Sequence, residues 1–462
     1  MSTLQKSDSP ILIVGHGTAG TALARNIALR GGNVVGYLDD SSTAPEVLGT
    51  LRDVNDVIAE HRIATVYFAI PSVGSKTVRD FINSIATDDI EFAIVPRTYS
   101  TLTRETVDIE DLTDVDVLDL VGREPVKHDL ESSRRFIAGK RVLVTGAAGS
   151  IGSQLVRQIA GMNAEAIACV DWWENGVFFL GQDLAAQENI EYHIADVKNE
   201  PLLDAIIGDF RPDIIFHAAA YKHVPLMQAN PLEAINNNVW GTLNLMRLAI
   251  AHAVPNFVYV STDKAVNPVN VMGATKRLGE MTMEALAKGS HGTTFNAVRF
   301  GNVIQSNGSV MQIFRKQISR KAPLTVTHAD VTRFFMTIDE ASQLIIQSAM
   351  MGSDSDIFVL DMGEPVKILD LARSLVKVVD PSLEIEITGL RPGEKMFEEL
   401  TYEPDNVGTT KNPKIFVVRD EIDFDESAFI RSLDEFLDRT RAYAITPTLA
   451  VDFLKRMGFA IQ

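Results

Sequence analysis

Apolar and polar positions along the chain follow two periods in turn, which predicts strands alternating with helices. In the first hundred residues the strands are expected at 11–14, 33–39, 64–70 and 91–96, and the helices after a turn at 15–20, at 51–61 and at 76–86. Strands that alternate with helices form parallel sheets with crossover helices. We therefore expect a Rossmann-like, doubly wound α/β domain that closes near residue 100.

A second and longer alternating series begins at Arg141. Its apolar runs lie at 166–171, 190–197, 212–220, 256–262 and 293–303. They predict a second Rossmann-like parallel sheet. The charged, irregular stretch 101–138 reads as a linker, so we expect domains at 1–125 and 126–462. A helical pattern at 231–253 and an amphipathic acidic helix at 425–444 complete the prediction. The acidic helix either packs on the domain surface or contacts a partner.

The composition narrows the class of protein. The chain has 462 residues and a net charge of −18, which argues against a nucleic-acid partner. The single cysteine, Cys169, lies in an apolar run and is expected to be a buried strand residue. The polar N-terminus lacks the apolar core of a signal peptide, and no run of about 18 apolar residues predicts a membrane span. We expect a cytoplasmic protein.

Each series opens on a glycine-rich turn between a strand and a helix, the context that makes such a motif credible. The second turn, TGAAGSIG, contains Gly146, Gly149, Ser150, Ile151 and Gly152. Its glycines let the backbone approach a pyrophosphate at the helix N-terminus. Asp171 ends the next strand at a spacing suited to an adenosine ribose. A carboxylate there favours NAD over NADP.

Two later strand ends are expected to contribute to the same cofactor site. Asp196 and Val197 follow the third strand, where an adenine amino group would lie, and the small residues Ala218, Ala219 and Ala220 follow the fourth. The first turn, with Gly15, Gly17 and Gly20, has its own acidic pair in Asp39 and Asp40. No catalytic pattern follows it, so it either binds a regulatory nucleotide-like ligand or is a structural relic.

The stretch STDKAVNPVNVMGATKR, residues 261–277, resembles a short-chain dehydrogenase active site. In those enzymes a Tyr usually lies four residues before a Lys. Lys276 is present, but Met272 occupies the Tyr position, and a thioether transfers no proton. The chemistry must therefore proceed without that Tyr, or the site is inactive.

These and other motifs together resemble the CapD-type nucleoside-diphosphate-sugar 4,6-dehydratases, which are extended short-chain dehydrogenases. The resemblance covers residues 141–400 almost continuously and includes TGAAGSIGSQLVRQI, HAAAYKHVPLM, NPLEAINNNVWGT, RFGNV, THADVTRFFMTIDEA, LDMGEPVKILDLA and GLRPGEKMFEEL. Larger members of the family often begin with membrane helices, and they also carry Met at the Tyr position. The segments after residue 300 form the substrate-binding part of such enzymes.

The resemblance implies a redox-neutral reaction of a UDP-N-acetylhexosamine, most often UDP-N-acetylglucosamine. Hydride leaves the sugar C4, water is eliminated across C5 and C6, and hydride returns to C6. Asp263 is expected to act as the acid at the C6 hydroxyl. Lys264 is expected to act as the base at C5, provided that desolvation or neighbouring cations such as Lys276 lower its pKa. Thr262 is expected to hydrogen-bond the C4 oxygen, and Lys276 the nicotinamide ribose. Asp263 is our hypothesis for the group that takes the C4 proton.

Further residues of the family motifs are expected to bind the substrate: Lys222, His223, Asn302, Arg333, Arg391 and Lys395. The arginines suit phosphate oxygens. Three positions depart from the family pattern, Gln228, Gln305 and Asn307. No histidine spacing predicts a metal site.

The leading hypothesis is therefore an NAD-dependent 4,6-dehydratase of bacterial glycan biosynthesis. A 4-epimerase or 4-reductase of a similar sugar, or a non-catalytic NAD- or nucleotide-sugar-binding regulator, are the alternatives. Helices such as 231–253 often pair between subunits in this superfamily, so we expect a homodimer or higher homo-oligomer.

Overall fold

The computed structural model describes residues 9–87, 89–95, 130–289, 292–304, 306–353, 355–402, 406–418, 424–442 and 444–461. It divides into two compact units. The first contains residues up to 124 together with 313–330 and 366–388, and the second contains 125–312, 331–365 and 389–462. The predicted boundary at 125, most of the predicted linker and Gln305 lie outside the described residues.

The first unit is built on a five-stranded parallel sheet in the order β3-β2-β1-β4-β5. Its strands are β1 (Pro10–Val14), β2 (Asn33–Leu38), β3 (Val47–Gly49), β4 (Thr65–Phe68) and β5 (Glu91–Ile94). Its helices α1 (Thr18–Leu29), α2 (Val54–His61) and α3 (Ser75–Ser84) lie where the sequence predicts them. β3 was not predicted, because a strand of three residues is too short to show an alternation of apolar and polar positions.

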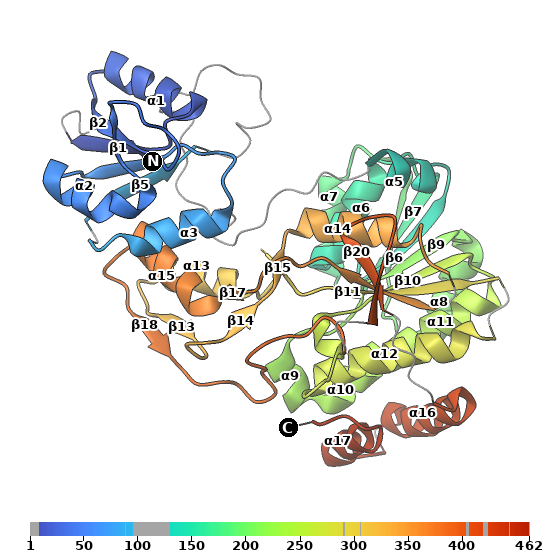
Figure 1. Ribbon diagram of the computed structural model, residues 1–462. Coiled ribbons are helices and arrows are strands. Elements are labelled where there is room, and N and C mark those ends of the chain that lie inside the picture. The colour runs from blue at the N-terminus through green and yellow to red at the C-terminus, as the bar shows by residue number, and fades with distance from the viewer. Residues whose placement is uncertain are drawn as a thin grey trace. The chain divides into compact units, whose positions relative to one another are not determined.

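Two segments from far along the chain join this unit. They contain β13 (Leu324–Val326), β17 (Val366–Lys367), α15 (Ile368–Val379) and β18 (Ile385–Ile387), and β13 pairs with β18 in parallel. Helix α15 packs against α3 (Figure 1). The Ser374 hydroxyl donates to Asn83 Oδ1 at 3.0 Å across this contact, and Lys377 Nζ donates to the carbonyl of Ile85.

The second unit contains a nine-stranded sheet in the order β19-β20-β16-β11-β10-β9-β6-β7-β8. The parallel strands are β6 (Arg141–Thr145), β7 (Ala166–Asp171), β8 (Ile190–Ile194), β9 (Ile214–His217), β10 (Asn256–Val260), β11 (Thr294–Arg299) and β16 (Asp356–Leu360). β20 (Ile415–Val418) and β19 (Val407–Thr409) add an antiparallel edge. The predicted doubly wound α/β fold is confirmed.

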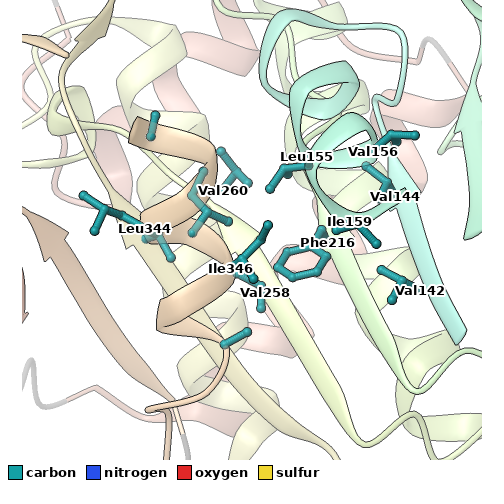
Figure 2. Packing of buried hydrophobic residues seen from close by; sticks show 14 of the residues in the cluster. Val142, Val144, Leu155, Val156, Ile159, Phe216, Val258, Val260, Leu344 and Ile346 are labelled. Atoms are coloured by element: carbon teal, nitrogen blue, oxygen red, sulfur yellow. The ribbon is translucent and has the colours of Figure 1, made fainter. Parts of the chain in front are cut away.

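The strands of this sheet are apolar runs because both faces are covered. Successive residues point to opposite faces, so Val142 and Val144 enter one core and Leu143 the other. The first core also holds Leu155 and Phe216, as Figure 2 shows. Cys169 is fully buried there, as predicted.

Helices cover the two faces of this sheet (Figure 1). One face contacts α6 (Ser150–Ala160) and α14 (Ile338–Ser348), and the other α8 (Glu200–Phe210), α11 (Gly241–Ala251) and α12 (Val271–Ala287). The remaining elements of this unit are α5 (Leu130–Ile137), α7 (Glu174–Asp183), α9 (Val224–Ala229), α10 (Pro231–Ile235), β12 (Asn302–Val303), β14 (Thr332–Arg333), β15 (Phe335–Met336), α16 (Glu426–Arg441) and α17 (Pro447–Arg456). Most of α13 (Val310–Ser319) lies in the 313–330 segment of the first unit.

The helix predicted at 231–253 is not a single α-helix. A π-helical turn at Asn236–Trp240 separates α10 from α11. Its asparagines are buried, and Asn238 Nδ2 donates to the carbonyl of Tyr221 and to Thr275 Oγ1, both at 3.0 Å. Such single π turns are frequent at functional sites.

The acidic C-terminal helix packs on its own unit. Phe429, Leu433 and Phe436 of α16 share an apolar cluster with residues of α12. Within the described residues, no helix has both the length and the apolarity to cross a membrane.

Candidate active site

The second glycine turn joins β6 to the N-terminus of α6. Gly146 has a φ of +67°, and a Cβ on it would lie 2.6 Å from the amide nitrogen of Ala219. A Cβ on Gly152 would lie 2.0 Å from the carbonyl oxygen of Gly146. Larger residues therefore fit at neither position, and the turn leads directly into the N-terminus of α6, which favours an anion.

A cavity of about 420 Å³ opens at this turn. It is lined by the predicted Gly146, Gly149, Asp171, Val197, Ala218, Ala219 and Ala220, and by Val170, Trp172, Trp173, Ala195, Tyr221 and Asn237. The aromatic residues of this lining were not predicted from the sequence. The exposed pair Trp172–Trp173 directly after a buried strand was the signal that could have identified them.

The Asp171 carboxylate holds this turn in place. It accepts hydrogen bonds from the amides of Ala148 at 3.0 Å and Trp173 at 2.9 Å. The glycine cradle, the helix N-terminus and a fixed carboxylate at the next strand end together fit an adenine dinucleotide.

The other predicted cofactor residues do not line the cavity. Ser150 Oγ accepts from the amide of Asn307 at 3.0 Å, and Ile151 packs against the core. Asp196 faces Lys198, whose Nζ lies 3.2 Å from its Oδ2.

The TDK sequence forms a short turn after β10, the strand next to β9 in the sheet. Thr262 Oγ1 donates to Asp263 Oδ1 at 2.9 Å, and Lys264 Nζ donates to the same oxygen at 2.9 Å. Asp263 is fully buried, and its Oδ2 has no hydrogen-bond partner among the described residues. Gly273 of α12 lets the helix approach, because a Cβ there would lie 2.2 Å from the carbonyl oxygen of Lys264.

Lys264 is held as an ammonium. Its Nζ also lies 3.3 Å from Asn302 Oδ1 and 3.8 Å from Glu398 Oε1. Burial alone would lower its pKa, but the charges of Asp263 and Glu398 raise it above the usual value. The condition under which we expected Lys264 to be a base, a lowered pKa, is therefore not met in this arrangement, because two carboxylates outweigh desolvation.

A buried ionic network lies behind this turn. Glu280 accepts from Ser261 Oγ at 2.7 Å, from Arg299 at 2.7 and 2.8 Å and from Arg277 at 3.0 Å. These cations hold the pKa of Glu280 at about 2 despite burial. Ser261 directly precedes Thr262, so the network fixes the backbone that carries the turn.

Lys276 lies one helical turn after Met272 on α12. Its Nζ donates to the carbonyl of Val260 at 2.6 Å and lies 3.9 Å from the centre of the Tyr259 ring. Burial lowers its pKa to about 7. Met272 is buried in an apolar cluster with Leu278 and residues of α16. At this position Met272 contributes packing and no acid–base group.

The predicted phosphate ligands differ in how far their donor groups already bond to other parts of the protein. The guanidinium group of Arg333 already bonds within the protein. Its NH1 donates to the carbonyls of Thr332 and Met396, and its NH2 donates to Glu394 at 3.0 Å. Lys395 Nζ donates to the carbonyl of Val266 at 3.0 Å. Arg391 is exposed.

Two further candidates come from the loop that begins α9. Burial and the charge of Lys264 lower the pKa of Lys222, and burial and the charge of Lys222 lower that of His223. The His223 ring lies against Gly308, where a Cβ would meet its Cε1 at 2.4 Å. In the described part of the chain, no group of three or more His, Cys, Asp or Glu side chains is placed to hold a metal ion.

Three relatives are informative. The chain is 40% identical over 407 residues to the capsular polysaccharide biosynthesis protein CapD of Staphylococcus aureus, covering 84% of this chain and 68% of CapD. It is 34% identical over 273 residues to a UDP-glucose 4-epimerase of Rickettsia bellii, covering 56% and 77%. It is 32% identical over 311 residues to an inverting UDP-N-acetylglucosamine 4,6-dehydratase of Campylobacter jejuni, covering 63% and 87%.

Solved structures agree on the fold. Pen from Bacillus thuringiensis is 34% identical with a TM-score of 0.58, covering 61% of this chain and 90% of Pen. A UDP-glucose 4-epimerase of Thermus thermophilus, solved with NAD, is 20% identical with a TM-score of 0.51, covering 56% and 90%. At that identity the likeness shows the fold alone.

The model of the family described as polysaccharide biosynthesis protein matches residues 142–420, which contain the glycine turn, the TDK turn and Lys276. Together with the 40% identity to CapD, this match is decisive. The chain belongs to the polysaccharide biosynthesis protein family and has the fold of an extended short-chain dehydrogenase.

Proposed function

We propose that the protein is an NAD-dependent 4,6-dehydratase of a UDP-N-acetylhexosamine, with UDP-N-acetylglucosamine as the first substrate to test. The observation that carries this proposal is the pair of the buried Asp263 and the partly buried Lys264 at the end of β10. Elimination of water across C5 and C6 requires an acid and a base in addition to the hydride transfers. A buried carboxyl group and an amine on adjacent residues provide both.

The cofactor in this proposal is held by residues of the second unit. Gly146 and Gly149 give the pyrophosphate access to the backbone, Asp171 binds the adenosine ribose, and Ala218–Ala220 leave room for the chain of the dinucleotide. Lys276 binds the nicotinamide ribose. NAD, when bound, provides the acceptor and donor of hydride.

The side chains of the TDK turn carry the protons. Asp263 takes the proton of the C4 hydroxyl, directly or through Thr262 or a water, and later gives a proton to the leaving C6 hydroxyl. Lys264, once its resting ammonium has given up a proton, takes the C5 proton and returns it to C5 when hydride reaches C6. Thr262 orients the C4 oxygen. Two protons enter the protein and two leave it, so the cycle balances.

A 4-epimerase is the second candidate, because relatives of similar identity carry that name. An epimerase moves hydride only at C4 and needs no acid at C6. The Asp263–Lys264 pair therefore favours elimination. A non-catalytic regulator would not require a buried carboxylate oxygen without a partner among the described residues.

NMR of the product formed from UDP-N-acetylglucosamine and NAD tests the proposal. We expect a 4-keto-6-deoxy sugar nucleotide. A C4 epimer would support the second candidate, and unchanged sugar would favour the regulator. A cytoplasmic location, a homo-oligomeric state and a ligand of the first glycine turn stay predictions.

A further inference from the structure

Lys264 lies between two buried carboxyl groups. Its Nζ is 2.9 Å from Asp263 Oδ1 and 3.8 Å from Glu398 Oε1. The Glu398 side chain is 4% exposed. Its Oε2, like Asp263 Oδ2, has no hydrogen-bond partner within the described residues. Each carboxyl group thus keeps one buried oxygen that is free to hold a proton.

This arrangement creates a chemical difficulty for the proposed reaction. The base that removes the C5 proton must be a neutral amine, whereas two carboxylates stabilise Lys264 as an ammonium. Asp263 is already assigned the proton of the C4 hydroxyl. The resting proton of Lys264 therefore needs a second acceptor within reach.

We infer that Glu398 is this acceptor: it takes the resting proton of Lys264 after the C4 proton has reached Asp263, and so frees the amine that attacks the C5 hydrogen. This inference rests on the proposed dehydratase function. Glu398 acts through Lys264 and is a positioning and proton-holding residue.

The proton count closes with Glu398 included. The resting cluster is Asp263 carboxylate, Lys264 ammonium and Glu398 carboxylate. The C4 proton goes to Asp263 when C4 is oxidised, for which bound NAD would supply the hydride acceptor, and the Lys264 proton goes to Glu398. Lys264 then takes the C5 proton, Asp263 protonates the departing C6 hydroxyl, and water leaves.

The second half of the cycle restores the resting protonation states of the cluster. When hydride returns to C6, Lys264 gives its proton back to C5, and Glu398 returns the stored proton to Lys264. No additional acid, base or oxidant is needed.

The surroundings of Glu398 suit a proton store. Burial raises its pKa and the charge of Asp263 does the same, while Lys264, Arg333 and Lys395 lower it, and the pKa stays above the usual value. Arg333 Nε lies 3.9 Å from Glu398 Oε1. The charge of Arg333 also disfavours the Lys264 ammonium. When the C4 proton neutralises Asp263, the electrostatic stabilisation of the Lys264 ammonium therefore becomes weaker.

The test compares Glu398→Gln, which keeps the shape but accepts no proton, with Glu435→Gln on the exposed face of α16. In single turnover of Glu398→Gln with UDP-N-acetylglucosamine, we expect reduced nicotinamide to form and persist. Deuterium from solvent should not enter C5, and kcat should fall roughly 100-fold or more with KM little changed. Glu435→Gln should match the wild type.

A second readout needs no cofactor. Without the Glu398 charge, the pH midpoint for acylation of Lys264, mapped by peptide mass spectrometry, should fall by roughly one to three units. For the same reason, raising the pH should restore part of the turnover in Glu398→Gln. Glu398→Asp, which keeps the carboxyl group at a greater distance, should give an intermediate kcat and covers the case in which the amide variant does not fold.

Three outcomes overturn the inference. One is unchanged turnover in folded Glu398→Gln. Another is an equal loss of nicotinamide reduction and elimination, which indicates a structural role. The third is an unshifted Lys264 midpoint. If wild-type protein itself yields a C4 epimer or unchanged sugar, the proposed dehydratase function fails and the role of Glu398 fails with it.

Discussion

At the scale of single residues, Asp263 is the group on which the proposed chemistry depends most. Its buried Oδ2 finds no hydrogen-bond partner in the described structure. We predict that Asp263→Asn abolishes both nicotinamide reduction and elimination, because the amide can take no proton from the C4 hydroxyl. Rapid-scanning absorbance in a single turnover measures the first step. If reduced nicotinamide still forms at the wild-type rate, another group is the C4 base.

Lys276 gives a prediction about stability. Burial lowers its pKa to about 7, although the charge of Glu280 raises it. From about pH 7 to about pH 10 the unfolded chain binds more protons at this residue than the folded chain does, so its contribution to stability rises with pH. Below about pH 7 the free-energy cost of burying the charged Lys276 side chain is fully present.

The substitution Lys276→Met removes this contribution to the pH dependence of the free energy of unfolding. Chemical unfolding of the cofactor-free protein should show a free energy that rises less steeply between about pH 7 and pH 10 in the variant than in the wild type. The variant should also be the more stable of the two below about pH 7. Identical pH profiles would mean that Lys276 is charged in the folded protein.

The residues of the site were predicted to different extents. Thr262, Asp263 and Lys264 were predicted from their place between YVST and MGATK in the family motif, and the structure brings their side chains together. Their catalytic roles stay predictions. Glu398 was missed, since a glutamate far downstream has no local signal and only the fold brings it to Lys264. Arg333 was predicted as a phosphate ligand, but burial beside Glu394 and two carbonyl groups occupies its donors, which no sequence pattern reveals.

At the scale of elements, the glycine turn before α6 is the most constrained feature. We predict that Gly152→Ala weakens NAD binding roughly tenfold or more, because its Cβ would meet the carbonyl oxygen of Gly146 and push the turn out of shape. Gly161→Ala at the end of the same helix is the control, since its Cβ would make only an ordinary contact at 3.4 Å. Calorimetric titration with NAD measures both, and equal affinities would refute the role of the turn.

Long periodic elements were predictable and short or irregular ones were not. The strand AIACVD was predicted with its observed bounds, because a doubly buried strand is a continuous apolar run. The π turn at Asn236–Trp240 was missed, because its asparagines keep the helical spacing while their side chains bond to Tyr221 and Thr275.

At the scale of the whole molecule, the first unit is assembled from segments far apart in the chain. Phe81 of α3 is buried, and α3 packs against α15. We predict that Phe81→Ala costs about 3–5 kcal/mol in the unit and lowers hydrogen-exchange protection in both α3 and residues 368–379. Protection in β6 and β10 should stay. Full protection of 368–379 in the variant would contradict this assembly.

Sequence order could not reveal this arrangement. The two alternating series predicted two Rossmann-like sheets, and both are present. Residues 313–330 and 366–388 follow the second series in the chain, so the pattern assigned them to it, whereas they belong to the first unit, in which α15 packs against α3. Which unit these two segments join depends on the apolar faces that meet in three dimensions.

In the proposed reaction, the hydride taken from C4 ends at C6. The most direct measurement follows deuterium from UDP-N-acetylglucosamine labelled at C4, with NMR and mass spectrometry of the product. We predict a 4-keto sugar with deuterium in its C6 methyl group. Deuterium that stays at C4, in an epimerised or an unchanged sugar, would contradict it.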